Sequence, residues 1–155
     1  MKTIRENTFE TNSSSCHTLI IVSKEEFEAV KNCNYLINYR KIVPAEQVYK
    51  ETMEELEQLE EKMSASYRAT YKTGLTFDVF KEVLKGFNSY SLTYSNRHDA
   101  YAGPIEDNET AVIAGLSEDY DTFETYGGEY YETYAESFTT KSGDEIVAFG
   151  YYGHD

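Results

Sequence analysis

The distribution of charge along this 155-residue chain constrains its fold more than any other feature. Residues 1–98 carry 14 acidic and 13 basic side chains, whereas residues 99–155 carry 14 acidic side chains and one base, Lys141. The same acidic segment holds eight of the 15 tyrosines. Disordered acidic tails are poor in aromatic residues, because they lack the apolar surface that would offset the entropy of folding. The composition therefore predicts that residues 99–155 fold and present an acidic, tyrosine-bearing surface.

The overall composition narrows the classes of partner and the cellular setting. The formal net charge is −14, and such a field repels nucleic acid and anionic lipid but attracts basic protein surfaces. No apolar run approaches the ~20 residues that a membrane helix needs, and the first residues lack the apolar core of a signal peptide. Two cysteines fit a reducing compartment. We expect a single domain over residues 1–155, in the cytoplasm, with no membrane and no direct nucleic-acid contact.

The beginning of the chain is typical of a strand followed by a short helix. Residues 17–22 form a run that predicts a buried strand. Ser23 and Glu26 have the spacing of a capping box, in which each side chain bonds to the backbone of the other. The helix that they start would turn Phe27 and Val30 inward.

The longest uninterrupted segment predicts one long helix. Residues 45–73 contain no Gly or Pro, and Gly74 follows directly. Twenty-nine helical residues would span roughly 43 Å, unless the helix breaks near residues 64–66. Its apolar side chains recur at alternating four- and three-residue steps, in a near-heptad pattern made by Tyr49, Met53, Leu56, Met63 and Tyr67. The pattern indicates either a long core helix or a coiled coil that forms a homodimer.

The remaining segments predict one more helix and then several strands. Thr76 is a helix cap, and one apolar helical face follows it, made by Phe77, Phe80, Val83, Leu84 and Phe87. Residues 95–108 resemble a loop, and residues 141–144 the turn of a hairpin. The segments with strand composition are 35–39, 111–114, 120–126, 130–140 and 145–152.

These elements predict an α+β fold. A helical centre with one long helix is followed by a C-terminal antiparallel β-sheet. Residues 1–98 form the helix-rich, nearly neutral part of the domain, and residues 99–155 form the acidic, tyrosine-rich β part.

Alternation along residues 130–138 predicts how the acidic residues are presented. Side chains two apart in a strand share a face, so acids and aromatics would gather on one side. Carboxylates at this spacing can imitate phosphate charge, and tyrosines supply flat contact area at small entropic cost. We therefore predict a partner-binding surface made of Asp119, Asp121, Glu124, Tyr126, Glu129, Tyr130, Glu132, Tyr134 and Glu136.

The most distinctive motif lies near the beginning of the chain. The run F-E-T-N-S-S-S-C-H-T covers residues 9–18 and follows Arg5. It resembles the N-terminal signature of uncharacterised phage and prophage proteins, which place an Arg a few residues before F-E-T-N-S-S-S-x-H-[ST]. The resemblance is confined to this stretch. It implies an origin in a phage or another mobile element, and it brings no established activity.

The same run contains donors that could bind a phosphate. The candidate ligand-binding residues are Arg5, Asn12, Ser13, Ser14, Ser15 and His17. Ser15 and His17 also raise the alternative of a small hydrolase. Their Cα atoms would lie ~6.6 Å apart in a strand, which is long for a proton transfer that needs about 3 Å. The competing interpretation is a loop whose polar groups cap its own backbone.

Other polar clusters do not predict a metal or catalytic site. The cysteines and histidines lack the paired spacing of zinc ligands. Asp119 and Asp121 begin like a calcium loop, but Glu124 and Tyr130 stand where that loop requires Gly and Glu. The run N-R-H-D at residues 96–99 has active-site residue types in a predicted loop, and we interpret it as solvated. We expect no metal, no cofactor and no enzymatic activity.

Charge, tyrosine content and the phage resemblance together predict an interaction protein. In size and charge the chain is similar to phage DNA-mimic proteins that block restriction or CRISPR systems. This similarity implies that it occupies the basic groove of a host nucleic-acid-binding protein, such as a CRISPR effector nuclease. Three alternatives stay open: an acidic surface that serves only solubility, a phosphate- or ligand-binding protein or hydrolase built on the N-terminal run, and a virion-associated structural protein.

Overall fold

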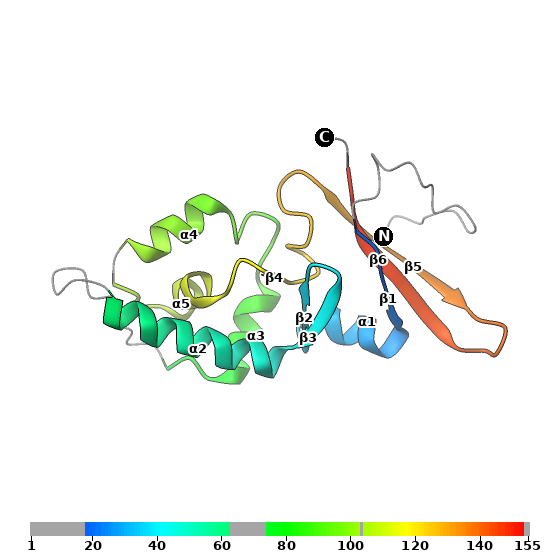
Figure 1. The fold of residues 1–155 in the computed structure, drawn as a ribbon, viewed down its shortest axis with the longest axis horizontal. Helices are drawn as coiled ribbons and strands as arrows, with labels where there is room; N and C mark the ends of the chain where they lie inside the picture. Colours follow the sequence, from blue (N-terminus) through cyan, green and yellow to red (C-terminus); the bar gives the residue numbers. More distant parts are fainter. Residues whose placement is uncertain (1–17, 63–73, 103, 154–155) are drawn as a thin grey trace.

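The fold is α+β, as the sequence predicts (Figure 1). The computed structural model describes residues 18–62, 74–102 and 104–153, which contain five helices and two antiparallel sheets. The larger sheet has the order β1–β6–β5, formed by Ile20–Ser23, Glu145–Tyr152 and Glu132–Thr139. The smaller sheet has the order β3–β2–β4, formed by Lys41–Pro44, Tyr35–Asn38 and Tyr120–Asp121. The helices are α1 Lys24–Lys31, α2 Ala45–Lys62, α3 Phe77–Lys85, α4 Tyr94–Tyr101 and α5 Asn108–Gly115.

Strand β2 separates two hydrophobic cores. Leu36 belongs to the buried cluster around helices α2 to α5, whereas Ile37 belongs to the cluster between the larger sheet and α1. Successive side chains of a strand point to opposite faces, so one short strand contributes to both cores. Figure 1 shows the result: helices α2 to α5 gather at one end of an elongated molecule, and the larger sheet with α1 forms the other end.

The predicted strand and capping box at the start of the described chain are present. The Ser23 hydroxyl accepts from the Glu26 backbone N–H at 3.1 Å, and the Glu26 carboxylate accepts from the Ser23 N–H at 3.0 Å. Phe27 and Val30 are buried, as predicted. The strand itself is buried on one face only: Ile21 is 60% exposed, because α1 packs against the other face of the sheet. A continuous apolar run cannot indicate such one-sided burial.

The described part of the predicted long helix ends at Lys62. Residues 63–73, which include the heptad positions Met63 and Tyr67, lie outside the described residues, so no single long helix is evident. Within α2, Tyr49, Met53 and Leu56 pack into the helical core of the same chain. These three positions therefore behave as the core-helix interpretation predicts. Gly115 of α5 approaches closely, since a Cβ there would lie 2.8 Å from Leu56 Cγ.

Two predicted non-helical segments are helices. The predicted loop at residues 95–108 contains α4, whose start is capped by the Thr93 hydroxyl. The predicted strand at residues 111–114 lies inside α5, which is capped by the Asp107 carboxylate at 2.7 Å from the Thr110 N–H. The last five residues of α5 are all buried. A helix buried on every side has no polar stripe, so its apolar run resembles a strand.

The C-terminal hairpin is present where the sequence predicts it. Strands β5 and β6 pair from Glu132 opposite Tyr152 to Thr139 opposite Glu145. Gly143 in the connecting turn has a φ of +90°, which only glycine adopts readily. The predicted strand at residues 120–126 is shorter. It is limited to β4, because Thr122 and Thr125 then bond to each other's backbone and side chains and turn the chain.

Candidate partner-binding cleft

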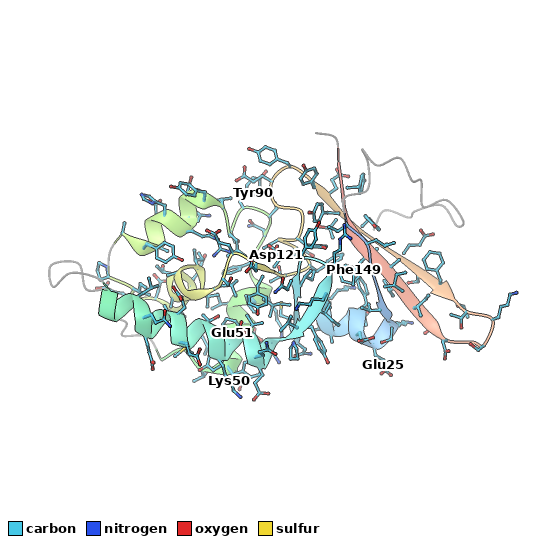
Figure 2. The ribbon with its side chains drawn as sticks, in the orientation of Figure 1. Glu25, Lys50, Glu51, Tyr90, Asp121 and Phe149 are labelled. Atoms are coloured by element: carbon cyan, nitrogen blue, oxygen red, sulfur yellow. The ribbon has the colours of Figure 1, made fainter. Side chains whose placement is uncertain are left out.

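A cleft of about 690 Å³ opens along the boundary between the two ends of the molecule. Its walls come from four distant parts of the chain: the β2–β3 turn, the segment before α4, the segment 118–131 and strand β6. Figure 2 shows Asp121 in the middle of the molecule, between the helices and the larger sheet. A volume of this size is typical of ligand-binding clefts, which cover about 300 to 1,000 Å³.

Carboxylates are the charged groups of this cleft. Four line it, and no Lys, Arg or His among the described residues does so. Three of the four are exposed, and Asp121 is partly buried. The lining acids are Glu118, Asp119, Asp121 and Glu129.

Asp121 is the most buried of the four lining acids. Burial raises the pKa of its carboxyl group to about 6, against the opposing effects of the Thr125 hydrogen bond and the Arg97 charge. The Thr125 hydroxyl donates to Oδ1 at 3.0 Å. Arg97 is itself buried, and its guanidinium donates to the carbonyls of Leu92 at 3.2 Å and Leu116 at 2.7 Å. Asp121 is therefore a desolvated carboxylate with one hydroxyl donor, and the buried Arg97 charge acts on it while the guanidinium bonds to backbone carbonyls.

Tyrosines form most of the aromatic surface of the cleft. Three of them are exposed at its rim: Tyr39 is 58% exposed, Tyr94 is 81% exposed and Tyr130 is 85% exposed. His98 stacks on the Tyr94 ring at 5.8 Å between centroids, and the Arg40 guanidinium lies 5.1 Å from the Tyr39 centroid. These contacts hold large, flat side chains at the surface, where aromatic residues are typical of binding interfaces.

The other three tyrosines build an inner wall. The Tyr151 ring lies 4.9 Å from the Tyr126 ring and 5.3 Å from the Tyr131 ring, between centroids. The Tyr126 hydroxyl donates to the backbone carbonyl of Tyr39 and ties the wall to the β2–β3 turn. Burial raises the pKa of Tyr126 to about 12. This hydroxyl therefore stays protonated at neutral pH and remains a hydrogen-bond donor.

The structure gathers only part of the predicted partner-binding surface. Asp119, Asp121, Tyr126, Glu129 and Tyr130 all line the cleft. Their side chains come from one segment, residues 119–130, which includes the short strand β4 and continues as turns, rather than from the strand that the period-two pattern indicated.

The other predicted surface residues lie elsewhere. Glu124 and Glu132 line a neighbouring hollow that also holds Lys31. Tyr134 and Glu136 are buried in β5, with 2% and 7% of their surface exposed, so this conformation does not offer them to a partner. The expectation that residues 130–138 expose one acidic and aromatic face is therefore wrong at these two positions. Alternation assigns residues to a face but does not say which face stays open.

Sequence reasoning missed half of the acidic and tyrosine residues that line the cleft. Tyr39, Tyr94, Glu118, Tyr131 and Tyr151 line it but were not predicted as site residues. Tyr39 lies in a tight turn with a φ of +56°, and no local sequence pattern indicates that this turn faces the cleft.

The candidate N-terminal ligand site, from Arg5 through Asn12, Ser13, Ser14 and Ser15 to His17, lies outside the described residues. The phosphate-binding and hydrolase alternatives therefore remain predictions. The N-R-H-D run has structural roles in α4. Asn96 donates to the Tyr90 carbonyl at 2.7 Å, and Arg97 joins the start of α4 to the end of α5. Neither residue lines the cleft.

The described residues also bear on a metal site, a reactive thiol and a membrane-spanning helix. In the part of the chain that the structure describes, no group of three or more His, Cys, Asp or Glu side chains is arranged to hold a metal ion. Burial raises the pKa of the Cys33 thiol to about 11, so it stays protonated and is a weak nucleophile at neutral pH. Over the same described residues, no helix has the length and apolar character needed to cross a membrane.

Comparison with protein-family models, with curated proteins and with solved structures finds no match to this chain. Its function is therefore argued from the cleft and from the charge around it.

Proposed function

We propose that this protein is an acidic interaction protein that binds the basic groove of a host nucleic-acid-binding defence protein and blocks it. The observation that carries the proposal is the cleft, in which four carboxylates and six tyrosines meet without a lining Lys, Arg or His among the described residues. Such a surface is complementary to the Lys and Arg side chains that a nucleic-acid groove presents. The protein would act in the cytoplasm of the host cell, as the phage resemblance of its N-terminal run implies.

The exposed acids and tyrosines supply different parts of the interaction. Three of the acids, Glu118, Asp119 and Glu129, are exposed. They attract a basic surface toward the cleft, and this attraction weakens as the ionic strength rises. Tyr94 and Tyr130 offer flat contact area with few side-chain torsions to restrict, which is typical of hot-spot residues. The contact surface thus centres on the cleft rather than on strand β5, where Tyr134 and Glu136 are buried.

The test compares two triple variants that change the net charge equally. Glu118→Lys, Asp119→Lys and Glu129→Lys reverse the cleft, whereas Glu28→Lys, Glu54→Lys and Glu57→Lys reverse exposed acids on α1 and α2. Both proteins are used to capture partners from host lysate, and the affinity for each captured basic protein is then measured over a salt series. We expect the cleft variant to lose about tenfold or more in affinity.

The control variant should stay close to the wild-type affinity, and added DNA duplex should compete for the partner. If both triple variants lost affinity equally, the net charge of the protein, and not the cleft, would account for binding. A partner whose binding does not respond to salt or duplex would contradict occupation of a nucleic-acid groove.

A further inference from the structure

The inner end of the cleft combines a desolvated carboxylate with an aromatic wall. Asp121, Tyr126 and Tyr151 line the same part of the cleft, and the two tyrosine rings meet edge to face at 83°. The charge of Asp121 acts on the hydroxyls of both tyrosines. Tyr131 extends the wall on the other side of Tyr151. Carboxylates and tyrosine faces both attract cations, and their attraction is stronger where water is partly excluded.

Asp121 has capacity left for a ligand. Thr125 donates to Oδ1, and the described residues give Oδ2 no hydrogen-bond donor. The buried Arg97 guanidinium is directed to two backbone carbonyls, so its charge acts on Asp121 without a direct ion pair. A donor that carries a positive charge would bind the second oxygen and offset the desolvation of the carboxylate.

The other lining acids provide further binding positions for positive charge along the cleft. Glu129 lies between Tyr126 and Tyr131 in the chain, and Glu118 and Asp119 follow the end of α5. A ligand that meets all of them would carry several positive charges separated by apolar atoms, because tyrosine rings line the cleft together with the carboxylates. Linear aliphatic polyamines have this chemistry: ammonium groups spaced by methylene chains.

We propose that the cleft binds a linear aliphatic polyamine, with one ammonium group on Asp121 against the partly exposed rings of Tyr151 and Tyr131, behind which the Tyr126 ring is buried. This binding goes beyond the proposed inhibition of a partner protein, since it needs no partner. The isolated protein can therefore be tested alone, and either proposal can fail without the other.

The experiment is calorimetric titration of the full chain with spermidine at low salt. The wild-type protein is compared with Asp121→Asn/Glu129→Gln and with the control pair Glu54→Gln/Glu57→Gln, which removes the same charge from the exposed face of α2. We expect the cleft pair to weaken spermidine binding by about tenfold, and the control pair to change it less than about twofold. If the cleft pair does not fold, the single variant Glu129→Gln is titrated in its place, because Glu129 is exposed and its substitution should leave the fold intact.

A second readout separates a specific site from counter-ion condensation. In ¹H–¹³C spectra, spermidine should shift the ring signals of Tyr126, Tyr131 and Tyr151, while magnesium chloride at equal charge should not. Equal weakening by the two variant pairs would overturn the proposal, as would identical tyrosine shifts with magnesium.

Discussion

Ionisation of the Asp121 carboxyl group destabilises the folded protein, because the group is partly buried. Burial raises the pKa of this group from 3.8 to about 6. Folding therefore favours the protonated form. The stability that this form contributes is complete below about pH 4 and is lost as the pH rises through about 6.

The Asp121→Asn variant tests this effect, because the amide is neutral at every pH and its oxygen can still accept from Thr125. We expect the variant to be more stable than the wild type at pH 7.5, by about 1 to 3 kcal/mol at 1.36 kcal/mol per pKa unit. At pH 4 the two proteins should differ little. Thermal unfolding at both pH values measures this, with the exposed Asp119→Asn as control. Equal stability of the two proteins at pH 7.5 would show that the carboxylate is well solvated and would contradict the raised pKa.

Gly150 is required by the close approach of two backbones. A Cβ at this position of β6 would lie 2.0 Å from the Thr18 carbonyl oxygen and 2.9 Å from the Tyr134 hydroxyl oxygen. Gly150→Ala should therefore cost about 2 to 3 kcal/mol or more in unfolding free energy, measured by urea titration. At Gly86 the nearest such atom is 3.5 Å away, and the φ is −85°. Gly86→Ala should be neutral or stabilise by up to about 1 kcal/mol. Similar costs at the two glycines would contradict the described register of β6 beside Thr18.

Helix α2 owes its position to packing against α5. Leu56 is 2% exposed and contacts the turn of α5 that ends at Gly115. Leu56→Ala should cost about 2 to 5 kcal/mol, because it leaves a cavity in the helical core. Leu59 is only half-buried, so Leu59→Ala should cost clearly less. Urea titration of both variants measures the difference. Equal costs would mean that a different face of α2 is buried.

Local chemistry explains which elements were predictable from the sequence. The Ser23 and Glu26 capping box, the Thr76 cap and the hairpin with Gly143 are each fixed by neighbouring residues, and all are present. Helix α5 was mistaken for a strand because burial on all sides removes the polar stripe. Glu51 shows the same limit. It is exposed on α2, and its carboxylate accepts from the Tyr120 hydroxyl at 2.6 Å, a contact between distant parts of the chain that no local pattern indicates.

At the scale of the whole molecule, the two cores should unfold together. Strand β2 contributes Leu36 to one core and Ile37 to the other, so the two cannot separate without exposing both residues. We expect far-UV circular dichroism and tyrosine fluorescence to report the same urea midpoint. Limited proteolysis should likewise leave residues 99–155 protected while the protein is folded. Two separate transitions, or rapid loss of that segment alone, would contradict a single cooperative domain.

The cleft itself could be predicted only in part. The acidic and aromatic character of residues 119–130 is visible in composition, and five of the predicted residues line the cleft. Tyr39, Tyr94 and Tyr151 reach it from three other parts of the chain, and no local pattern brings them together. Their meeting depends on the packing of the two cores against β2, which is a tertiary property.

The most direct test of the central claim locates the contact on the partner complex. A carbodiimide joins carboxylates to amines that form an ion pair, so each covalent link marks a carboxylate in contact with a lysine of the captured partner. Mass spectrometry of the complex should find the links at Glu118, Asp119 and Glu129, which are exposed around the cleft. Links confined to Glu28, Glu54 and Glu57, with none at the cleft, would contradict the account, because the equally exposed acids of α1 and α2 would then form the binding surface.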